Sequence, residues 1–188
     1  MTSLLDWLRE RIAGLNGGAS TGAPVPDRAA SIDRVAPWLY IGPVLPAEGW
    51  SGLAERGVTH VLDLRAEADE DASAIEALGM RWRHVPIADR DAPDDAQLES
   101  IIDWLDDEAD SSVDQAVYIH CHAGFGRTPT VAIALLMQQD LTLAEARRLV
   151  FAARPDVSPT TRQMAWLERL EARLRPPASA DDASPDGE

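Results

Sequence analysis

Short apolar runs alternate with longer amphipathic segments along most of the chain. Apolar or alternating runs of about four to eight residues predict strands over 38–41, 58–64, 80–87 and 116–119. Apolar residues at helical spacing predict helices over 46–56, 70–78, 96–107, 130–140, 143–153 and 160–174. Strands that alternate with helices are typical of a mostly parallel sheet. We therefore expect an α/β domain with a mostly parallel central sheet of four to five strands, flanked by helices on both faces.

The two ends of the chain differ from this pattern. Residues 1–15 predict a short amphipathic helix, and the charges among them are unlike the apolar core of a secretory signal. Residues 16–30 have the glycine, alanine, serine and proline content of a flexible linker. Residues 176–188, rich in proline, alanine, serine and aspartate, predict a disordered acidic tail. The range 31–175 is then one folded domain.

Composition narrows the classes of function. No stretch approaches the ~18 apolar residues of a membrane span. The net charge of −15 argues against binding to nucleic acid or to an anionic membrane, because both select basic surfaces. Cys121 is the only cysteine, which excludes an internal disulfide and suits the reducing cytoplasm. We expect a cytoplasmic monomer.

The segment 116–130 carries the clearest chemistry, because an apolar strand leads through a short loop into a helix. Backbone N–H groups at such a junction point toward one spot, and the helix dipole adds positive potential there. Glycines allow the backbone to form a tight loop around an anion, and an arginine can hydrogen-bond two phosphate oxygens at once. The sequence predicts a phosphate-binding loop made of His122, Ala123, Gly124, Phe125, Gly126 and Arg127.

Cys121 stands at the end of the strand, beneath this loop. The field that attracts phosphate also favours thiolate over thiol, so a nucleophile and a phosphate site coincide. This arrangement resembles the cysteine-dependent protein tyrosine phosphatase superfamily, whose signature is His-Cys, five residues, Arg, then Ser or Thr. The matching residues are His120, Cys121, Gly124, Arg127 and Thr128, whereas Pro129 stands where a glycine is often found.

The resemblance extends over about residues 34–174. Residues 57–64, which follow a predicted strand and helix, are similar to the opening of the dual-specificity branch of the superfamily. Arg65 and Glu67 follow the strand within this segment, where open α/β sheets place functional loops. We expect each of them to form a structural ion pair.

The resemblance implies a two-step displacement. Cys121 attacks phosphorus and forms a phosphocysteine, while Arg127 and the loop N–H groups bind the phosphoryl oxygens. An aspartate after a Pro-Ile strand end protonates the leaving oxygen in this family, and this position corresponds to Asp89. Asp91 is the alternative acid. No cofactor or metal is implied.

Three further residues each have two interpretations. The family pattern implies that Thr128 donates its hydroxyl to the sulfur that leaves in the second step, but Thr128 also fits a helix cap. His120 either hydrogen-bonds the loop backbone and helps to hold Cys121 as thiolate, or is a buried histidine with no such role. Gln163 corresponds to a water-positioning glutamine of the family, or it is a solvent-facing residue of the last helix.

The residues of the loop also bear on the class of substrate. Members that act on phospholipids tend to carry lysines in the loop, where this chain has His122, Ala123 and Phe125. This favours a phosphorylated protein, with phosphotyrosine first and phosphoserine or phosphothreonine next. A phospholipid or a small phosphometabolite is the alternative within the superfamily. The cleft is expected to be shallow, because the extended element of the deep-pocket tyrosine-specific branch is missing.

Two other classes place a cysteine in comparable surroundings. Rhodanese-like sulfurtransferases also have a cysteine in a loop of N–H donors, but Asp89 and the signature from His120 to Thr128 argue against this class. A zinc site at His120, Cys121 and His122 is disfavoured, because adjacent residues at a strand end point in alternate directions. We therefore expect no metal.

Overall fold

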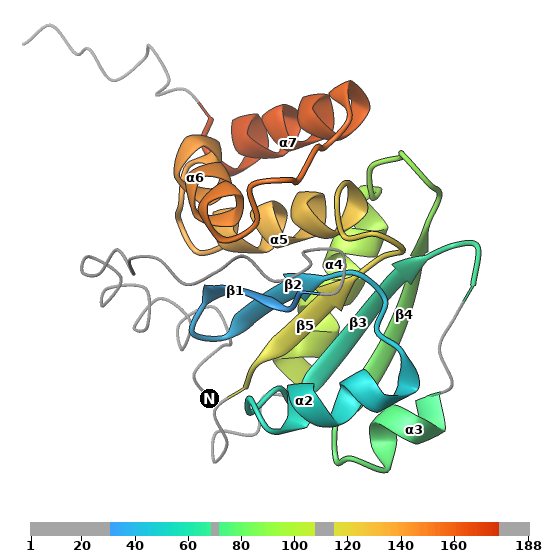
Figure 1. Cartoon of the computed structure of the whole chain (residues 1–188). Helices are drawn as coiled ribbons and strands as arrows, with labels where there is room; N and C mark the ends of the chain where they lie inside the picture. The colour runs from blue at the N-terminus through green and yellow to red at the C-terminus, as the bar shows by residue number, and fades with distance from the viewer. Residues whose placement is uncertain (1–30, 69–71, 108–114, 177–188) are drawn as a thin grey trace, which may run out of the picture.

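The computed structural model describes residues 31–68, 72–107 and 115–176 (Figure 1). The helix expected at 1–15, the linker at 16–30 and residues 177–188 of the tail lie outside these ranges. The sheet has five strands in the order β1-β2-β5-β3-β4, and only the β1–β2 pair is antiparallel. The strands are β1 (Asp33–Ala36), β2 (Leu39–Gly42), β3 (His60–Arg65), β4 (Arg81–Ile87) and β5 (Val117–His120). The prediction of a mostly parallel sheet is confirmed.

Strand β1 is the element that the sequence pattern did not indicate. It has four residues, and its first two, Asp33 and Arg34, are charged. It lies at the edge of the sheet, where one side of the strand needs no partner, so a continuous apolar run is not required. Its pairing with β2 is irregular between Arg34 and Ala36.

Helices cover both faces of the sheet (Figure 1), as the alternation predicted. One apolar core joins Ile119 of β5 to α4 (Asp95–Asp107), α5 (Arg127–Met137), α6 (Leu143–Ala153) and α7 (Thr161–Leu174). A second core joins Tyr118, the preceding residue of β5, to Trp50 of α2 (Trp50–Ala54) and Ile75 of α3 (Ala72–Glu76). Successive strand residues point to opposite faces, which explains the two cores.

The helix boundaries differ from the sequence prediction most clearly in two helices. The helix expected over 46–56 is divided into a 3-10 turn, η2 (Ala47–Gly49), and the short α2. Helix α5 begins at Arg127, three residues earlier than predicted. Pro129 therefore lies within the first turn of α5, where its missing N–H is not needed.

The parallel strands bring three loops together. Asp63 of β3 pairs with His120 of β5, and Arg65 of β3 pairs with Ile87 of β4. The residues that follow these strands consequently emerge at one edge of the sheet, the carboxyl edge on which functional sites of open α/β folds are built. Among the helices described, none has the length and continuous apolar character that a membrane span requires.

Candidate active site

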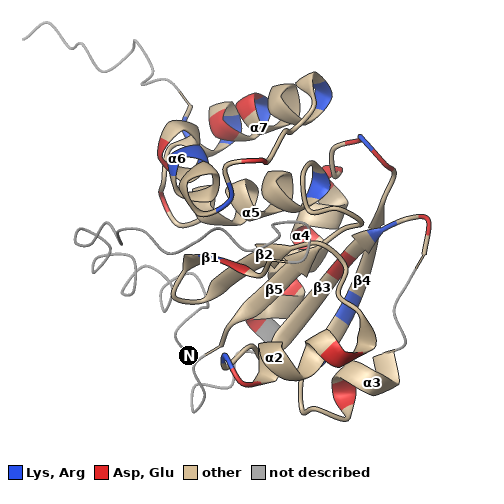
Figure 2. Cartoon of the chain, viewed as in Figure 1, with Lys and Arg blue, Asp and Glu red and all other residues tan. Residues whose placement is uncertain are grey.

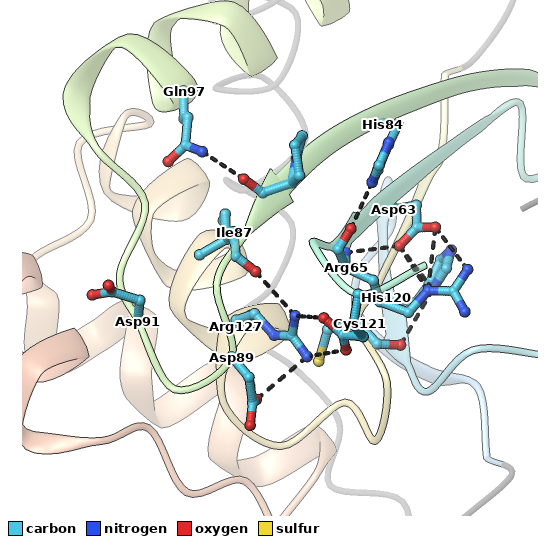
Figure 3. Close-up of polar contacts among 12 residues, drawn as sticks. Asp63, Arg65, His84, Ile87, Asp89, Asp91, Gln97, His120, Cys121 and Arg127 are labelled. Carbon is cyan, nitrogen blue, oxygen red and sulfur yellow. Dashed lines mark hydrogen bonds and ion pairs between the residues drawn. The ribbon is translucent and has the colours of Figure 1, made fainter. Parts of the chain in front are cut away.

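Cys121 follows directly after β5 and lines a cavity of about 770 Å³ at this edge. The walls of the cavity are the loop 121–127, the loop after β4 and the start of α7. Its side chain is largely covered by protein, and Figure 3 shows its sulfur beside the guanidinium of Arg127. The cysteine therefore faces the cavity, as the motif requires.

Four carbonyl groups of the loop 122–127 accept hydrogen bonds from surrounding segments. The donors to these carbonyls are Val44 N to His122 O at 3.1 Å, Arg154 Nη2 to Ala123 O at 3.3 Å, Ser158 N to Phe125 O at 2.7 Å, and Thr130 Oγ1 to Gly126 O at 2.8 Å. Within the described part of the chain, the N–H groups of residues 122–127 form no hydrogen bond. They remain available for the oxygens of an anion.

Gly124 is required by two features of this loop. Its φ is +74°, a conformation that side chains rarely adopt. A Cβ at this position would lie 2.5 Å from the carbonyl oxygen of Gly42, at the end of β2. The tight turn that the sequence predicted at Gly124 therefore also allows a close approach to the neighbouring strand.

Arg127 is buried and is fixed by three hydrogen bonds (Figure 3). Its Nη1 donates to Glu67 Oε2 at 2.7 Å and to the carbonyl of Ile87 at 3.0 Å, and its Nη2 donates to Glu67 Oε1 at 2.7 Å. The hydrogen bonds from Arg127 lower the pKa of Glu67 to about 2, and the same contacts raise the pKa of Arg127. Both groups are charged over the whole neutral range.

These contacts decide which edge of the guanidinium is left for a ligand. A guanidinium has five N–H donors, and Glu67 and Ile87 take three of them. The Nε donor and one Nη2 donor remain, and they form a second fork that matches two oxygens of a phosphoryl group. Asp89 Oδ1 lies 3.4 Å from Nη2, so its carboxyl group borders this fork.

Asp89 and Asp91 occupy different environments. Asp89 lines the cavity together with Cys121, and 73% of its side chain is exposed. Asp91 instead contacts two residues of α7. Its carboxylate pairs with Arg162 Nη1 at 3.2 Å, and its carbonyl accepts a hydrogen bond from Gln163 Nε2 at 2.8 Å. The geometry favours Asp89 over Asp91 as the acid, and this assignment stays a prediction.

His120 lies beneath the loop, fully buried in β5. Its Nδ1 is 3.3 Å from the carbonyl oxygen of Cys121 and 3.8 Å from Asp63 Oδ1, while Asp63 is paired with Arg65. Burial lowers the pKa of His120 to about 4, so the ring is neutral near pH 7. His120 thus contacts the loop backbone, as predicted, but it brings no positive charge to Cys121.

The structure decides against one interpretation for each of Thr128 and Gln163. Gly126 is the N-cap of α5 and no side chain caps the helix, so the capping role of Thr128 is wrong. Its buried hydroxyl has no hydrogen-bond partner in the described ranges. Gln163 is fully buried, so its solvent-facing interpretation is also wrong.

Gln163 connects the two sides of the cavity. Its Oε1 accepts a hydrogen bond from Thr160 N at 2.7 Å, and its Nε2 reaches the loop that carries Asp89 through the carbonyl of Asp91. Its amide lies next to Gly126, because a Cβ on that glycine would be 3.3 Å from Gln163 Oε1. This place suits the predicted water-positioning role, which no observation tests.

Two features of the site were not assigned from the sequence. Glu67 was expected only in a structural ion pair, and its partner is the arginine of the signature. Arg154 was given no role, yet its guanidinium bonds the loop at Ala123 and lies 5.1 Å from the centre of the Phe125 ring. In the described residues no group of three histidine, cysteine or acidic side chains is placed to hold a metal ion.

Comparisons with known proteins agree with this geometry. A family model described as "Polymorphic toxin system, DSP-PTPase phosphatase" matches residues 42–140. Dual specificity protein phosphatase 1-A of Xenopus laevis is 27% identical over 167 residues, which cover 87% of this chain and 43% of the relative. The chain thus spans less than half of the length of that curated relative.

Two solved structures have the same fold. Tk-PTP in its active form is 29% identical with a TM-score of 0.67, and the match covers 76% of this chain and 97% of that one. Human DUSP28 is 28% identical with a TM-score of 0.64, and the match covers 81% and 99% of the two chains. The resemblance read from the signature and the α/β fold expected from the alternating pattern are confirmed.

Proposed function

Because the chain belongs to the DSP-PTPase phosphatase family of polymorphic toxin systems, we propose that it hydrolyses phosphomonoesters through a cysteine nucleophile. One observation carries this proposal. Cys121 lines one cavity together with Arg127 and most of the loop 122–127, whose N–H groups have no hydrogen-bond partner among the described residues. This is a site for a dianionic phosphoryl group with a nucleophile directly beside it.

In the first step the Cys121 thiolate attacks phosphorus, and the bond between phosphorus and the ester oxygen breaks. The leaving oxygen takes a proton from the carboxylic acid of Asp89, which lines the cavity and is largely exposed. The phosphoryl group is then bound to Sγ as a phosphocysteine. The loop N–H groups and Arg127 bind its oxygens throughout, so no reorganisation is needed as charge moves.

In the second step a water molecule attacks phosphorus and the S–P bond breaks. The Asp89 carboxylate takes a proton from the water, and inorganic phosphate and the Cys121 thiolate are released. Gln163, which lies between the loop that carries Asp89 and Gly126, positions this water. Thr128, whose hydroxyl has no other partner in the described chain, donates to the departing sulfur.

The proposed substrate is a phosphorylated protein, with phosphotyrosine as the first candidate and phosphoserine or phosphothreonine as the next. The relative from Xenopus laevis is named a dual specificity protein phosphatase. The loop positions His122, Ala123 and Phe125 carry no lysine or arginine that would meet the further phosphates of a lipid head group. A free thiolate is kept reduced in the cytoplasm, where we place the enzyme.

Hydrolysis of p-nitrophenyl phosphate tests this proposal. The wild type should release p-nitrophenol, and Cys121→Ser and Arg127→Ala should each lose nearly all activity. Mass spectrometry of rapidly quenched wild-type enzyme should find a phosphoryl group on Cys121. Turnover of thiosulfate faster than that of aryl phosphates would instead assign the site to sulfur transfer.

A further inference from the structure

A row of polar side chains crosses three adjacent strands beneath the phosphate-binding loop (Figure 3). It consists of His120 of β5, Asp63 and Arg65 of β3, and His84 of β4. Asp63 is in register with both histidines. Figure 2 shows both signs of charge at the end of β3, where Asp63 and Arg65 lie. Asp63 is fully buried and has no part in the two chemical steps proposed above.

The carboxylate of Asp63 is held by Arg65. Its Oδ1 accepts hydrogen bonds from the backbone N–H of Arg65 at 2.9 Å and from Nε at 3.0 Å, and its Oδ2 accepts one from Nη2 at 2.8 Å. The carbonyl of Arg65 lies 2.6 Å from His84 Nε2, which anchors the residue from the neighbouring strand. Buried ion pairs add little to stability, because the cost of removing both charges from water offsets their attraction. A fully buried carboxylate therefore points to a role other than stabilisation.

The carboxylate of Asp63 lies beside the ring nitrogen that contacts the loop. His120 Nδ1 is 3.8 Å from Asp63 Oδ1 and 3.3 Å from the carbonyl oxygen of Cys121. Both neighbours are acceptors, so a proton on Nδ1 is attracted by both, whereas a lone pair there would be repelled by both. The rings of Trp50 and Tyr118 pack against the imidazole, with centroids 5.7 and 5.8 Å away, and restrict its rotation.

This environment assigns the tautomer of His120. The ring is neutral near pH 7, because burial lowers its pKa to about 4, and a neutral imidazole carries one ring proton. With that proton on Nδ1, Nε2 is unprotonated, and this nitrogen has no hydrogen-bond partner among the described residues. The opposite tautomer would bury an unpaired N–H and place a lone pair against two oxygens.

The proton on Nδ1 determines the direction of one donor in the loop. The carbonyl of Cys121 and the N–H of His122 belong to one trans peptide, so they point in opposite directions. When the carbonyl accepts a hydrogen bond from His120 beneath the loop, the N–H points to the opposite side. His122 and Cys121 both line the cavity. The hydrogen bond from His120 thus aims the first N–H of the loop.

We propose that Asp63 is a positioning residue of the phosphate-binding loop. Its carboxylate, held by Arg65, keeps the proton of His120 on Nδ1. The hydrogen bond from Nδ1 to the carbonyl of Cys121 then fixes the first peptide of the loop. The proposal rests on the proposed function, because this loop is the proposed site of the phosphoryl group. Asp63 touches neither substrate nor reacting atoms and acts through His120.

Nitrogen NMR of the wild type tests the tautomer without a change to the ion pair. In protein labelled on the histidine nitrogens, protonated and unprotonated ring nitrogens have well separated chemical shifts. The signals that are missing in His120→Asn belong to His120. At pH 7 its Nδ1 should be protonated and its Nε2 unprotonated. The opposite tautomer, or a ring protonated at both nitrogens, would overturn the proposal.

The double variant Asp63→Leu/Arg65→Met tests the role of the carboxylate. It removes the ion pair as a unit, so its stability in urea unfolding should stay close to that of the wild type. The dissociation constant of inorganic phosphate, measured by calorimetry, should rise about 10- to 100-fold, as expected for one misdirected hydrogen bond to a charged group. The His120 signals should show a mixture of both tautomers.

Two further variants separate this role from a general effect of charge. Asp63→Asn keeps an oxygen that accepts from His120 Nδ1, so it should keep the tautomer and bind phosphate within about threefold of the wild type. Asp95→Leu/Arg173→Met removes an ion pair of 2.7 Å between α4 and α7, and it should alter neither measurement.

Two results from the variants would overturn the role of Asp63. One is an Asp63→Leu/Arg65→Met protein that keeps both the tautomer and the phosphate affinity of the wild type. The other is an equal loss of phosphate affinity in Asp95→Leu/Arg173→Met, which would show that loss of any ion pair has this effect. If the tautomer and phosphate binding are as expected but the wild type hydrolyses no phosphomonoester, the proposed function is contradicted and the role of Asp63 is supported.

Discussion

The carboxylate of Glu67 holds the guanidinium of Arg127 through two hydrogen bonds of 2.7 Å, across 60 residues of sequence. Glu67 follows β3 and Arg127 begins α5, so the contact joins two loops at the carboxyl edge of the sheet. It uses one edge of the guanidinium and presents the other to the cavity. Glu67 therefore positions the guanidinium of Arg127, to which we assign the binding of phosphate.

Glu67→Gln should lower kcat/KM for p-nitrophenyl phosphate on the order of 10- to 100-fold, because a misplaced guanidinium loses its alignment with the phosphoryl oxygens. The affinity for inorganic phosphate, measured as a competitive inhibition constant, should fall as well. Glu48→Gln, an equal change at an exposed position of η2, should alter neither value. Full activity of Glu67→Gln would show that the loop alone holds Arg127.

Replacement of the two candidate acids should separate their roles. Asp89→Asn should lower kcat for phosphotyrosine about 10²- to 10⁴-fold, since the leaving oxygen loses its proton donor. Asp91→Asn should have a smaller effect, because Asp91 holds the loop against α7. Steady-state kinetics of both variants measure the difference. If Asp91→Asn has a much lower kcat and Asp89→Asn a normal one, Asp91 is the general acid instead.

Gly124→Ala should disrupt the phosphate-binding loop. The new Cβ would lie 2.5 Å from the carbonyl oxygen of Gly42, so the loop has to move and kcat/KM should fall about 100-fold. Gly57→Ala is the matched control, because Gly57 has a similar positive φ of +76° but nothing within 4 Å of the added Cβ. It should cost about 1 kcal/mol of stability in thermal unfolding and leave activity intact. Equal losses of activity would rule out the steric explanation.

The free energy of unfolding should decrease as the pH falls from about 6.5 to about 4. Burial lowers the pKa of both His60 and His120 to about 4, whereas a histidine in the unfolded chain titrates near 6.5. The unfolded state therefore binds more protons in this window, so each neutral buried histidine contributes stability above pH 6.5 that is lost below it.

His60→Gln isolates this contribution, because the carboxylates that also titrate are unchanged. Between pH 7 and pH 5, urea unfolding of the variant should lose about 2 kcal/mol less than that of the wild type. Equal pH dependence of the two proteins would mean that the pKa of His60 is the same in the folded and unfolded states.

The sequence was sufficient for the parts of the site that are close together in the chain. The strand, the loop and the helix around Cys121 are contiguous, and the spacing from His120 to Thr128 is local information. The sheet could also be predicted, because its central strands β2, β3 and β5 are buried along their whole length and the strands alternate with helices. Edge strand β1 could not be predicted, because its first two residues, Asp33 and Arg34, are partly or fully exposed and charged, so the strand has no continuous apolar run.

The long-range contacts could not be predicted in the same way. Glu67 and Arg65 were both expected in ion pairs, and each has one, but only the folded chain shows that Arg65 pairs with Asp63 and Glu67 with Arg127. Burial of Gln163 depends similarly on how α7 packs against the loop after β4. Side chains of the same charge and pattern have several possible partners until the tertiary structure selects one.

Four separate segments donate hydrogen bonds to the carbonyl groups of the phosphate-binding loop. The donors are Val44 in the loop after β2, Arg154 at the end of α6, Ser158 before α7 and Thr130 in α5. No single segment can shape the anion cradle alone, so a fragment that keeps the Cys121 motif but lacks any of them should be inert. Recovery of turnover during refolding should then coincide with the last of these segments to dock, which makes enzymatic activity a reporter of complete folding.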